Sequence, residues 1–592
     1  MAVVTAVLPG VAAATQVQLA IAGDDEIVDA VRAASLVAQT VSDDPDAPRR
    51  DIVAAAQADY RRLLAALYDR GHFGPVISIR VDGTEATDLP LIGTGQPVRI
   101  VRIEVAPGPL FRLGAVGVSP VAGGTELPED FRAGAPAETA ILRETTAAAV
   151  EGWRARGHAK ADLASQEIVA DHPERQLDVA LRIAPGPRLR YGPIGIRGEE
   201  NVRTTQIRRI ANLSPGDVFD PEEVEAAARR LQRTGAFRSV TVTEAEAVGP
   251  NDTLPMTVEV IERLPRRFGF GAEVGSTEGL GLSAFWLHRN LTGFADSLRI
   301  EGEASGIGGD SGGADFRLGA DYVRPATFNP ETDLTFGIEV ERLDQPDFIS
   351  DRFSTEIGAR RIVSDEFQYT YGFAYTFSKT EDAFGEREFS ILSVPATAIY
   401  DRRDDPLNPA DGYYVEAGLE PFQGFLSAGT GLRFDADLRG YQGFGPERGT
   451  VIAARFQLRS VFGPDRDDIP PEWLFFSGGG GTVRGQPFQD LAVEEDVDGD
   501  GEDDRVGGKS FLGISGELRQ AVTDSIGLVG FVDVGFVSPE ADFTGGESHA
   551  GAGVGVRYNT GIGPIRLDLG VPVSGPNENK GVEIYIGIGQ SF

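Results

Sequence analysis

Few residues of this 592-residue chain have the type and spacing that covalent or metal chemistry requires. Cysteine is absent, which excludes thiol nucleophiles, zinc thiolates, iron–sulfur ligation and disulfides. No GxSxG nucleophile elbow is found. The five histidines form no HExxH pattern and no close ligand pair; they are His72, His158, His172, His288 and His549. The sequence therefore predicts neither an enzyme nor a metal or cofactor site.

Two short segments resemble ligand loops, but each lacks an essential residue. The string GGKS at 507–510 ends like a phosphate-binding loop, yet Asp503 stands where its first glycine belongs. The acidic run 496–504 begins like a calcium loop, but Gly507 replaces the final bidentate Glu. Its alternating acidic positions are Asp496, Asp498 and Asp500. We expect a solvated loop here, with a weak calcium site as the alternative.

Composition and charge argue against one class of binding partner, and the N-terminal residues bear on the compartment of the protein. With 55 basic and 90 acidic residues the formal charge is −35, which argues against nucleic-acid binding. No apolar run reaches the ~18 residues of a membrane-spanning helix. The segment 1–15 begins with fourteen uncharged, mostly apolar residues ending in three alanines, which is typical of a signal-peptide remnant. The basic start of such a signal is missing, so an ordinary apolar terminus is the alternative, and whether Met1 is the true start stays open.

The elements that must position any functional residue fall into two halves. Residues 1–262 contain 22 of the 75 glycines, and residues 263–592 contain the other 53. In the first half, apolar residues at helical spacing (52–68, 221–232) are followed by β-branched runs, which predicts an α/β region. In the second half the apolar residues alternate, as in Phe268, Phe270, Ala272 and Val274, which predicts consecutive β-strands.

The first half contains an internal repeat. The string APGPLFRLGAVGV at 106–118 returns as APGPRLRYGPIGI at 184–196. A glycine that we expect to stop a helix, followed by a strand, occurs at Gly71, Gly157 and Gly235. Three tandem β-α-α-β-β units are predicted.

The second half fits a transmembrane β-barrel better than a soluble sandwich. Ile565, Leu567 and Leu569 alternate with Arg566 and Asp568, so the charges keep to one face. A charge facing lipid costs ~2–4 kcal/mol at mid-membrane, whereas a wet lumen tolerates it. The length suits about 16 antiparallel strands. The last residue, Phe592, lies in phase with the apolar series at 582, 584, 586 and 588, so we expect it to face outward as a C-terminal signal.

These features resemble the superfamily of POTRA-bearing outer-membrane assembly and transport barrels. The resemblance covers nearly the whole chain and implies POTRA 1 at 16–110, POTRA 2 at 111–188, POTRA 3 at 189–263 and an outer-membrane barrel at 264–592. The most specific string is FFSGGGGTVRGQPFQD, 475–490, which is similar to the VRGY/VRGF motif of the superfamily. By this resemblance Val483, Arg484, Gly485 and Gln486 form a loop inside the lumen, and Arg484 pairs with Asp533 on the inner wall. Gln486 departs from the usual aromatic residue, which leaves the packing of the loop tip in doubt.

Three POTRA units and no plug-like helix before the first favour the TamA branch of the superfamily. This resemblance implies a protein in the bacterial outer membrane with periplasmic POTRA units, a TamB-like periplasm-spanning partner and unfolded outer-membrane proteins as clients. The strands that must close the barrel carry glycine on the inner face, at Gly269, Gly271, Gly587 and Gly589, so we expect a weak seam that could open toward the lipid. A secretion pore for a single cargo is the alternative function.

Overall fold

The computed structural model describes residues 4–7, 15–90, 96–309, 312–445, 448–497, 499–561, 563–578 and 580–592. By internal contacts the chain divides into two compact units. One comprises residues 1–194, 213–225 and 244–256; the other comprises 195–212, 226–243 and 257–592. The third predicted repeat is therefore shared between the units. None of the helices in the described residues has the length and hydropathy of a membrane-spanning helix.

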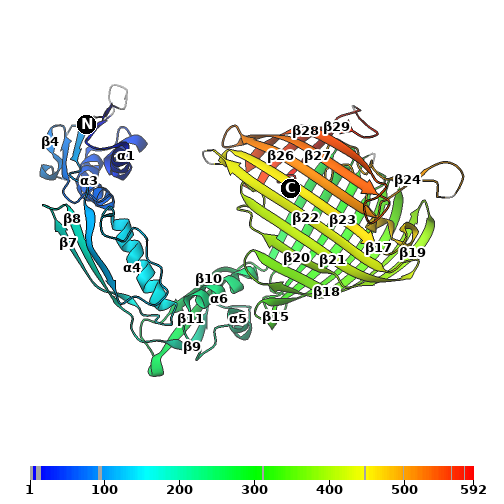
Figure 1. Ribbon diagram of the computed structural model, residues 1–592, viewed down its shortest axis with the longest axis horizontal. Coiled ribbons are helices and arrows are strands. Elements are labelled where there is room, and N and C mark those ends of the chain that lie inside the picture. Colours follow the sequence, from blue (N-terminus) through cyan, green and yellow to red (C-terminus); the bar gives the residue numbers. More distant parts are fainter. Residues whose placement is uncertain are drawn as a thin grey trace. The chain divides into compact units, whose positions relative to one another are not determined.

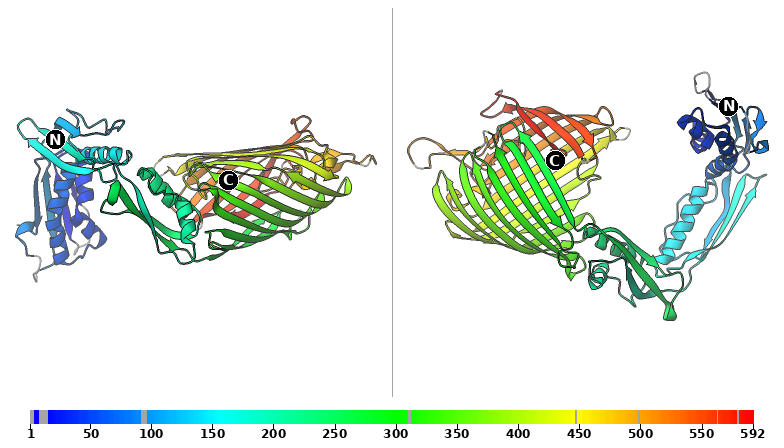
Figure 2. Two further views of the ribbon diagram at one scale, coloured as in Figure 1. Left: turned by 90° about the horizontal axis from the view of Figure 1, so that it is seen from below. Right: turned by 180° about the vertical axis from the view of Figure 1, so that it is seen from behind.

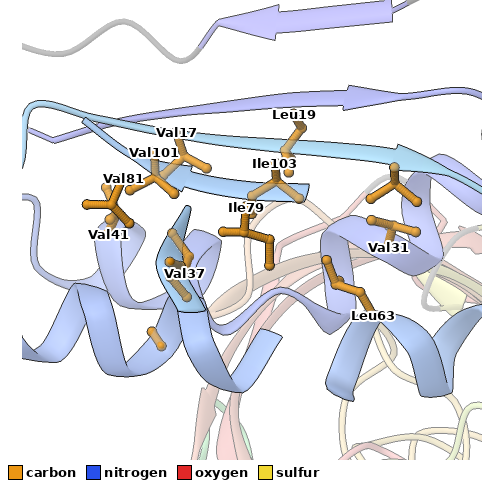
Figure 3. Packing of buried hydrophobic residues seen from close by; sticks show 14 of the residues in the cluster. Val17, Leu19, Val31, Val37, Val41, Leu63, Ile79, Val81, Val101 and Ile103 are labelled. Carbon is orange, nitrogen blue, oxygen red and sulfur yellow. The ribbon is translucent and has the colours of Figure 1, made fainter. Parts of the chain in front are cut away.

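The first repeat packs helices against one sheet. Its helices are α1 (Asp25–Ala34), α2 (Leu36–Asp43) and α3 (Arg49–Asp69). The sheet order is β1-β2-β5-β3-β4, with strands at Val4–Val7, Gln16–Ile21, Val76–Val81 (β3), Thr84–Glu85 (β4) and Ile100–Ala106 (β5). Buried aliphatic side chains of the strands and helices meet between the two layers, as Figure 3 shows for Val17, Ile103, Val31 and Leu63. Strand β1 lies in the segment where a signal remnant was expected, and it pairs with β2.

The second repeat is simpler than the predicted unit. It contains β6 (Arg112–Ser119), α4 (Thr139–Arg154), β7 (Asp162–Asp171) and β8 (Gln176–Ala184), in the sheet order β6-β8-β7. Where a first helix was expected, residues 120–138 form turns and irregular backbone. This segment contains three prolines and three glycines, which disfavour a helix. The β-α-α-β-β pattern is thus reduced to one helix here.

The third repeat has the predicted order of elements. These are β9 (Arg190–Arg197), α5 (Thr204–Ala211), α6 (Pro221–Arg233), β10 (Phe237–Glu244) and β11 (Thr253–Glu262). The predicted helix stops are also confirmed, because Gly71, Gly157 and Gly235 have φ values of +80°, +92° and +72°. Other residues adopt this left-handed conformation only with strain.

The second half closes into an antiparallel barrel, seen in Figure 1 and in the further views of Figure 2. Segments β19 and β20 pair with the same two neighbours on either side of Val394-Pro395 and form one interrupted strand, so the described residues give the sixteen strands expected. The strands are β12 (Arg266–Gly275), β13 (Gly279–His288), β14 (Ser297–Ile307), β15 (Asp315–Asn329), β16 (Thr332–Gln345), β17 (Phe348–Ile362), β18 (Phe367–Asp382), β19 (Gly385–Ser393), β20 (Ala396–Asp401), β21 (Gly412–Leu426), β22 (Gly431–Phe444), β23 (Thr450–Phe462), β26 (Ser510–Ala521), β27 (Ile526–Ser538), β28 (Glu547–Thr560), β29 (Gly563–Ser574) and β30 (Glu583–Ile588).

The two faces of the wall differ as the alternation predicted. Along β29, Leu567 and Leu569 are exposed on the outside, whereas Asp568 is fully buried on the inside. Between β23 and β26, residues 463–509 form a long connection with two short helices and the small hairpin of β24 (Val493–Glu495) and β25 (Asp504–Val506). In that hairpin Asp496 accepts hydrogen bonds from the N–H groups of Gly499 and Gly501, while Asp498 lies outside the described residues.

Candidate functional site

The motif segment 475–491 lies inside the barrel. Backbone hydrogen bonds hold its two ends: Phe475 exchanges a pair at 2.8 Å with Gly508, and Ser477 exchanges a pair with Leu491. Between these ends Val483, Arg484 and Gln486 are buried, and Val483 and Gln486 are buried completely. The long connection therefore turns back into the lumen at the motif.

Arg484 is held by carboxylates from three strands. Its Nε and Nη2 donate to the two oxygens of Asp533 at 2.8 and 3.0 Å, so the guanidinium and the carboxylate form a bidentate pair. Its Nη1 donates to Glu517 at 2.6 Å and to Asp568 at 3.4 Å. The guanidinium also lies 3.8 Å from the ring centroid of Phe531. The structure thus brings Arg484 and Asp533 together, as the motif implied.

The charges around Arg484 balance. Arg519 donates to Glu517 at 2.8 Å, and Arg557 forms an ion pair with Asp568. Three guanidinium groups therefore face three carboxylates, and every one of these side chains is at most 7% exposed. Removing one member leaves an uncompensated buried charge, which is far more costly than removing an exposed ion pair.

Inner-wall glycines make room for the loop. A Cβ on Gly551 would lie 2.0 Å from the carbonyl oxygen of Arg484, and a Cβ on Gly570 would lie 2.7 Å from the nitrogen of Gly485. Gly485 itself has φ +93°, and a Cβ there would lie 2.7 Å from the backbone of Val571. The loop backbone therefore packs directly on the backbone of β28 and β29.

Gln486 stands where an aromatic residue is usual and makes polar contacts in its place. Its Nε2 donates to the carbonyl oxygens of Ala550 at 2.7 Å and Ser574 at 2.8 Å. The amide ties the loop tip to β28 and β29, and this accounts for the packing that the sequence left in doubt.

Several residues of the site were not singled out from the sequence. Glu517, Phe531 and Tyr585 each occupy an inward position of a strand, but so do many other residues. The available signal was an acidic residue in the inward phase of a late strand, and this applies equally to Glu517 and Asp533. Which acid meets Arg484 depends on the registers of β26, β27 and β29, and no local pattern sets these.

The barrel closes through an unusually short pairing. Strand β12 pairs with β13 over ten residues, and β29 pairs with β30 over six. Between β12 and β30 the register contains two residue pairs, Val274–Ile586 and Gly275–Tyr585. Residues 266–273 of β12 thus have no ladder partner on this side among the described residues.

One more backbone hydrogen bond, from Ser276 N to Ile584 O at 3.0 Å, and a few contacts of side chains also cross this seam. Thr277 Oγ1 donates to Glu583 at 3.3 Å, and Ile584 N donates to Ser276 Oγ at 2.9 Å. An ion pair of 2.6 Å joins Arg566 of β29 to Glu273 of β12. It passes Gly587, where a Cβ would lie 3.1 Å from Arg566.

The other predicted seam glycines lie as follows. Gly269 and Gly271 face Phe285 and Ser283 of β13. The side chains of these two β13 residues occupy the space beside the glycines, and no residue of β30 does so. Gly589 has φ +96° and follows the end of β30.

The expectation that Phe592 faces outward is wrong. It is 7% exposed and packs with Tyr441, Val451 and Ala453 inside the barrel. Its main-chain oxygen accepts a hydrogen bond from Arg519 at 3.1 Å. The alternation was extrapolated beyond Ile588, but the backbone turns at Gly589 and leaves the wall.

The loop also touches both sides of the seam. Gly485 N donates to Tyr585 Oη on β30 at 3.1 Å. Gly480 N donates to Glu278, in the turn between β12 and β13, at 2.7 Å. The segment anchored by Arg484 therefore bridges the two strands that close the barrel.

Comparison with known proteins agrees with a POTRA-bearing barrel. The Omp85 superfamily domain matches residues 290–592, just over half of the chain, and POTRA, described as "Surface antigen variable number repeat", matches residues 189–263. The fold and the match define an outer-membrane barrel with periplasmic POTRA repeats. The chain belongs to the Omp85 superfamily.

Individual proteins similar to this chain have low sequence identity to it. Outer membrane protein assembly factor BamA of Neorickettsia risticii (strain Illinois) is 23% identical over 491 residues, which are 78% of this chain and 63% of the relative. This chain thus spans less than two thirds of the length of that protein. BamA of Haemophilus ducreyi lacking POTRA domains 1–3 has a TM-score of 0.63 at 17% identity, covering 81% of this chain and 99% of that one. CdiB of Acinetobacter baumannii has a TM-score of 0.53 at 13% identity, covering 82% and 90%. These two likenesses show the fold.

Proposed function

We propose that this protein is an outer-membrane assembly factor that inserts or translocates β-rich outer-membrane proteins, autotransporters among them, through the seam between β12 and β30. The observation that carries the proposal is the two-residue register at this seam. The proposed activity makes or breaks no covalent bond.

An open β12 edge would act on a client through its backbone. Residues 266–273 present N–H and C=O groups that lack partners from β30. Unsatisfied backbone groups in lipid cost several kcal/mol each, so a client strand that pairs with them is stabilised. The barrel would supply a template edge, and the short register would keep the work of opening small.

The loop anchored by Arg484 would set how far the seam opens. Its contacts reach Tyr585 on one side and Glu278 on the other. Because Arg484 fixes the same loop to three other strands, the anchor would hold the closing strands together from inside the lumen.

The POTRA repeats would present clients and a TamB-like periplasmic partner to the barrel. Strand β7 is an edge strand of ten residues, and most of its side chains are exposed on both faces. Such an edge is suited to pairing with an extended chain. A secretion pore for one exported cargo, as in two-partner secretion, remains the second candidate.

The test is a reversible crosslink across the seam. Val274 and Ile586 are register partners, so Val274→Cys with Ile586→Cys places two thiols opposite each other in a chain that has no other cysteine. We expect the oxidised variant to fail in supporting client insertion in a depleted strain and the reduced variant to support it. Normal insertion by the fully oxidised protein would refute the lateral mechanism.

The matched control crosslinks the same residue within one hairpin. Val274→Cys with Leu280→Cys joins β12 to β13 and leaves the seam free, so insertion should continue. A census of outer-membrane proteins after depletion separates the two functions. Loss of several unrelated barrels supports assembly, whereas loss of one exported protein supports the pore.

A further inference from the structure

An arginine patch lies where β11 passes into β12. We define it as Arg263, Arg266 and Arg289. The chain carries 35 more acidic than basic residues, yet none of these three side chains forms an ion pair with a carboxylate among the residues that the structure describes. Positive charge without a counterion is therefore concentrated at this point of a strongly acidic protein.

Main-chain contacts bring the three arginines to one turn of the chain. Arg289 N donates to Pro265 O at 2.7 Å, and its Nη1 donates to Leu264 O at 3.1 Å. Arg263 Nε donates to Phe237 O at 2.9 Å, and Arg266 is the register partner of His288. Partial burial lowers the pKa of Arg289, and the like charges of Arg263 and the neighbouring Arg267 lower it further.

The nearest acid in sequence does not neutralise the patch. Glu262 accepts hydrogen bonds from the backbone N–H groups of Glu200, Asn201 and Val202 at 2.8–2.9 Å. Its carboxylate is thus occupied on the side of the third repeat. A ligand with negative oxygens would complete the patch.

The patch stands at the level of the membrane surface. Phe268 and Phe270, on the outer face of β12, are 64% and 84% exposed and belong in lipid. Leu264, on the periplasmic side, is 82% exposed. Trp286 lies beside His288 on the outer face of β13, with ring centroids 5.9 Å apart, and tryptophan is typical of the membrane–water interface.

We propose that the arginine patch binds the headgroup of an anionic phospholipid of the periplasmic leaflet, with its acyl chains against Phe268 and Phe270. The phosphate oxygens accept hydrogen bonds from the three guanidinium groups and balance their charge. The acyl chains cover the apolar outer face of the unpaired β12 edge. The site concentrates anionic lipid at the foot of the seam. This inference does not depend on the clients that the seam serves.

Trp286 provides a direct measurement. The chain has three tryptophans; Trp153 lies in the second POTRA repeat and Trp473 is buried in the loop region, so a Trp153→Phe, Trp473→Phe protein reports from Trp286 alone. This full-length protein is reconstituted in vesicles containing either brominated phosphatidylglycerol or brominated phosphatidylcholine at equal mole fraction. We expect the relative association of phosphatidylglycerol at Trp286 to be at least about fivefold higher, since one interfacial Arg contributes ~1 kcal/mol.

Arg266→Gln is the sharpest variant, because Arg266 makes no side-chain hydrogen bond among the described residues and its loss should leave the fold intact. Selectivity should fall by about fivefold in R266Q and vanish in R263Q/R266Q/R289Q. The control variant R361Q/R402Q, at the same end of the opposite wall, should keep the selectivity.

Equal quenching by both lipids, or selectivity unchanged in the triple variant, would overturn the proposal. Loss of selectivity in about 20 mM inorganic phosphate at constant ionic strength would also overturn it, because the patch would then be a free-phosphate site.

Discussion

At the scale of single residues, the lumen site is a neutral network of buried ions. Arg484 and Asp533 could be paired from the sequence only through the resemblance of residues 475–490 to the superfamily motif, because alternation alone fits Glu517 equally well. The contributions of Glu517, Asp568 and Tyr585 could not, because they depend on registers between strands that are far apart in sequence. The glycines that leave room for the loop backbone, Gly551 above all, cannot be distinguished in the sequence from other glycines of the barrel strands.

Replacing Arg484 by Gln should destabilise the barrel. The change leaves buried carboxylates in excess, and breaking a buried pair costs about 3–5 kcal/mol. We expect a lower urea midpoint for the barrel in detergent and faster proteolysis within residues 475–491. The urea midpoint of Arg484→Lys should lie between those of the unaltered protein and Arg484→Gln, because lysine keeps the charge but loses the bidentate pair.

Asp533→Asn offers the matching half of a double-mutant cycle. The double variant R484Q/D533N should be less destabilised than the sum of the two single variants, since both remove the same interaction. Strict additivity would mean that the 2.8 Å contact contributes nothing.

Replacing Gly551 by Ala should displace the loop. The new methyl group would lie 2.0 Å from Arg484 O, and overpacking of this kind costs about 1–3 kcal/mol. Gly530→Ala is the control, because a Cβ there meets nothing within 4 Å. Accelerated loop proteolysis should appear in G551A alone; equal behaviour of both variants would argue against close backbone packing.

At the scale of elements, alternation and repeats predicted most strands and helices, and failed where a local feature ended the pattern. The alternation at 582–588 does not continue to Phe592, because Gly589 adopts φ +96° and Phe592 packs inside the lumen. The second repeat has one helix fewer than predicted because the prolines and glycines of 120–138 disfavour a helix. Glycine on the inner face predicts only a weak seam, and no feature of the sequence predicts that β12 and β30 share just two residue pairs.

Glu262 should make the junction between the third repeat and the barrel sensitive to acid. Burial raises the pKa of Glu262, but hydrogen bonds from the N–H groups of Val202, Glu200 and Asn201 outweigh it, and the pKa is lowered. A lowered folded pKa stabilises the fold above the unfolded value of about 4.3, and this contribution is lost as pH falls through the folded pKa.

Amide exchange at residues 200–202 measures this effect. We expect protection to fall with pH below about 4.3 in the unaltered protein. Glu262→Gln should lower protection by about 1 kcal/mol at neutral pH and remove that pH dependence. Glu259→Gln, on the same strand, is the control. A pH dependence that survives in E262Q would assign it to another group.

At the scale of the whole molecule, the step in glycine content predicts the boundary between the α/β region and the barrel, and the length of the second half suits sixteen strands. The sequence could not show that part of the third repeat associates with the barrel. Gln206 Nε2 donates to Pro325 O at 3.0 Å, and Arg203 N donates to Gly293 O at 2.9 Å. Helix α5 is therefore fixed to the periplasmic turns of the barrel, and this depends on tertiary contacts that no periodicity reveals.

The central claim is that the barrel is closed by a short, openable register braced by the Arg484 loop. Hydrogen–deuterium exchange of the full-length protein in lipid nanodiscs tests it most directly. We predict that residues 266–273 exchange much faster than β16 and β17, which pair over fourteen residues, and that R484Q extends fast exchange to 274–275 and β30. Protection of 266–273 equal to that of β16, unchanged in R484Q, would contradict the account.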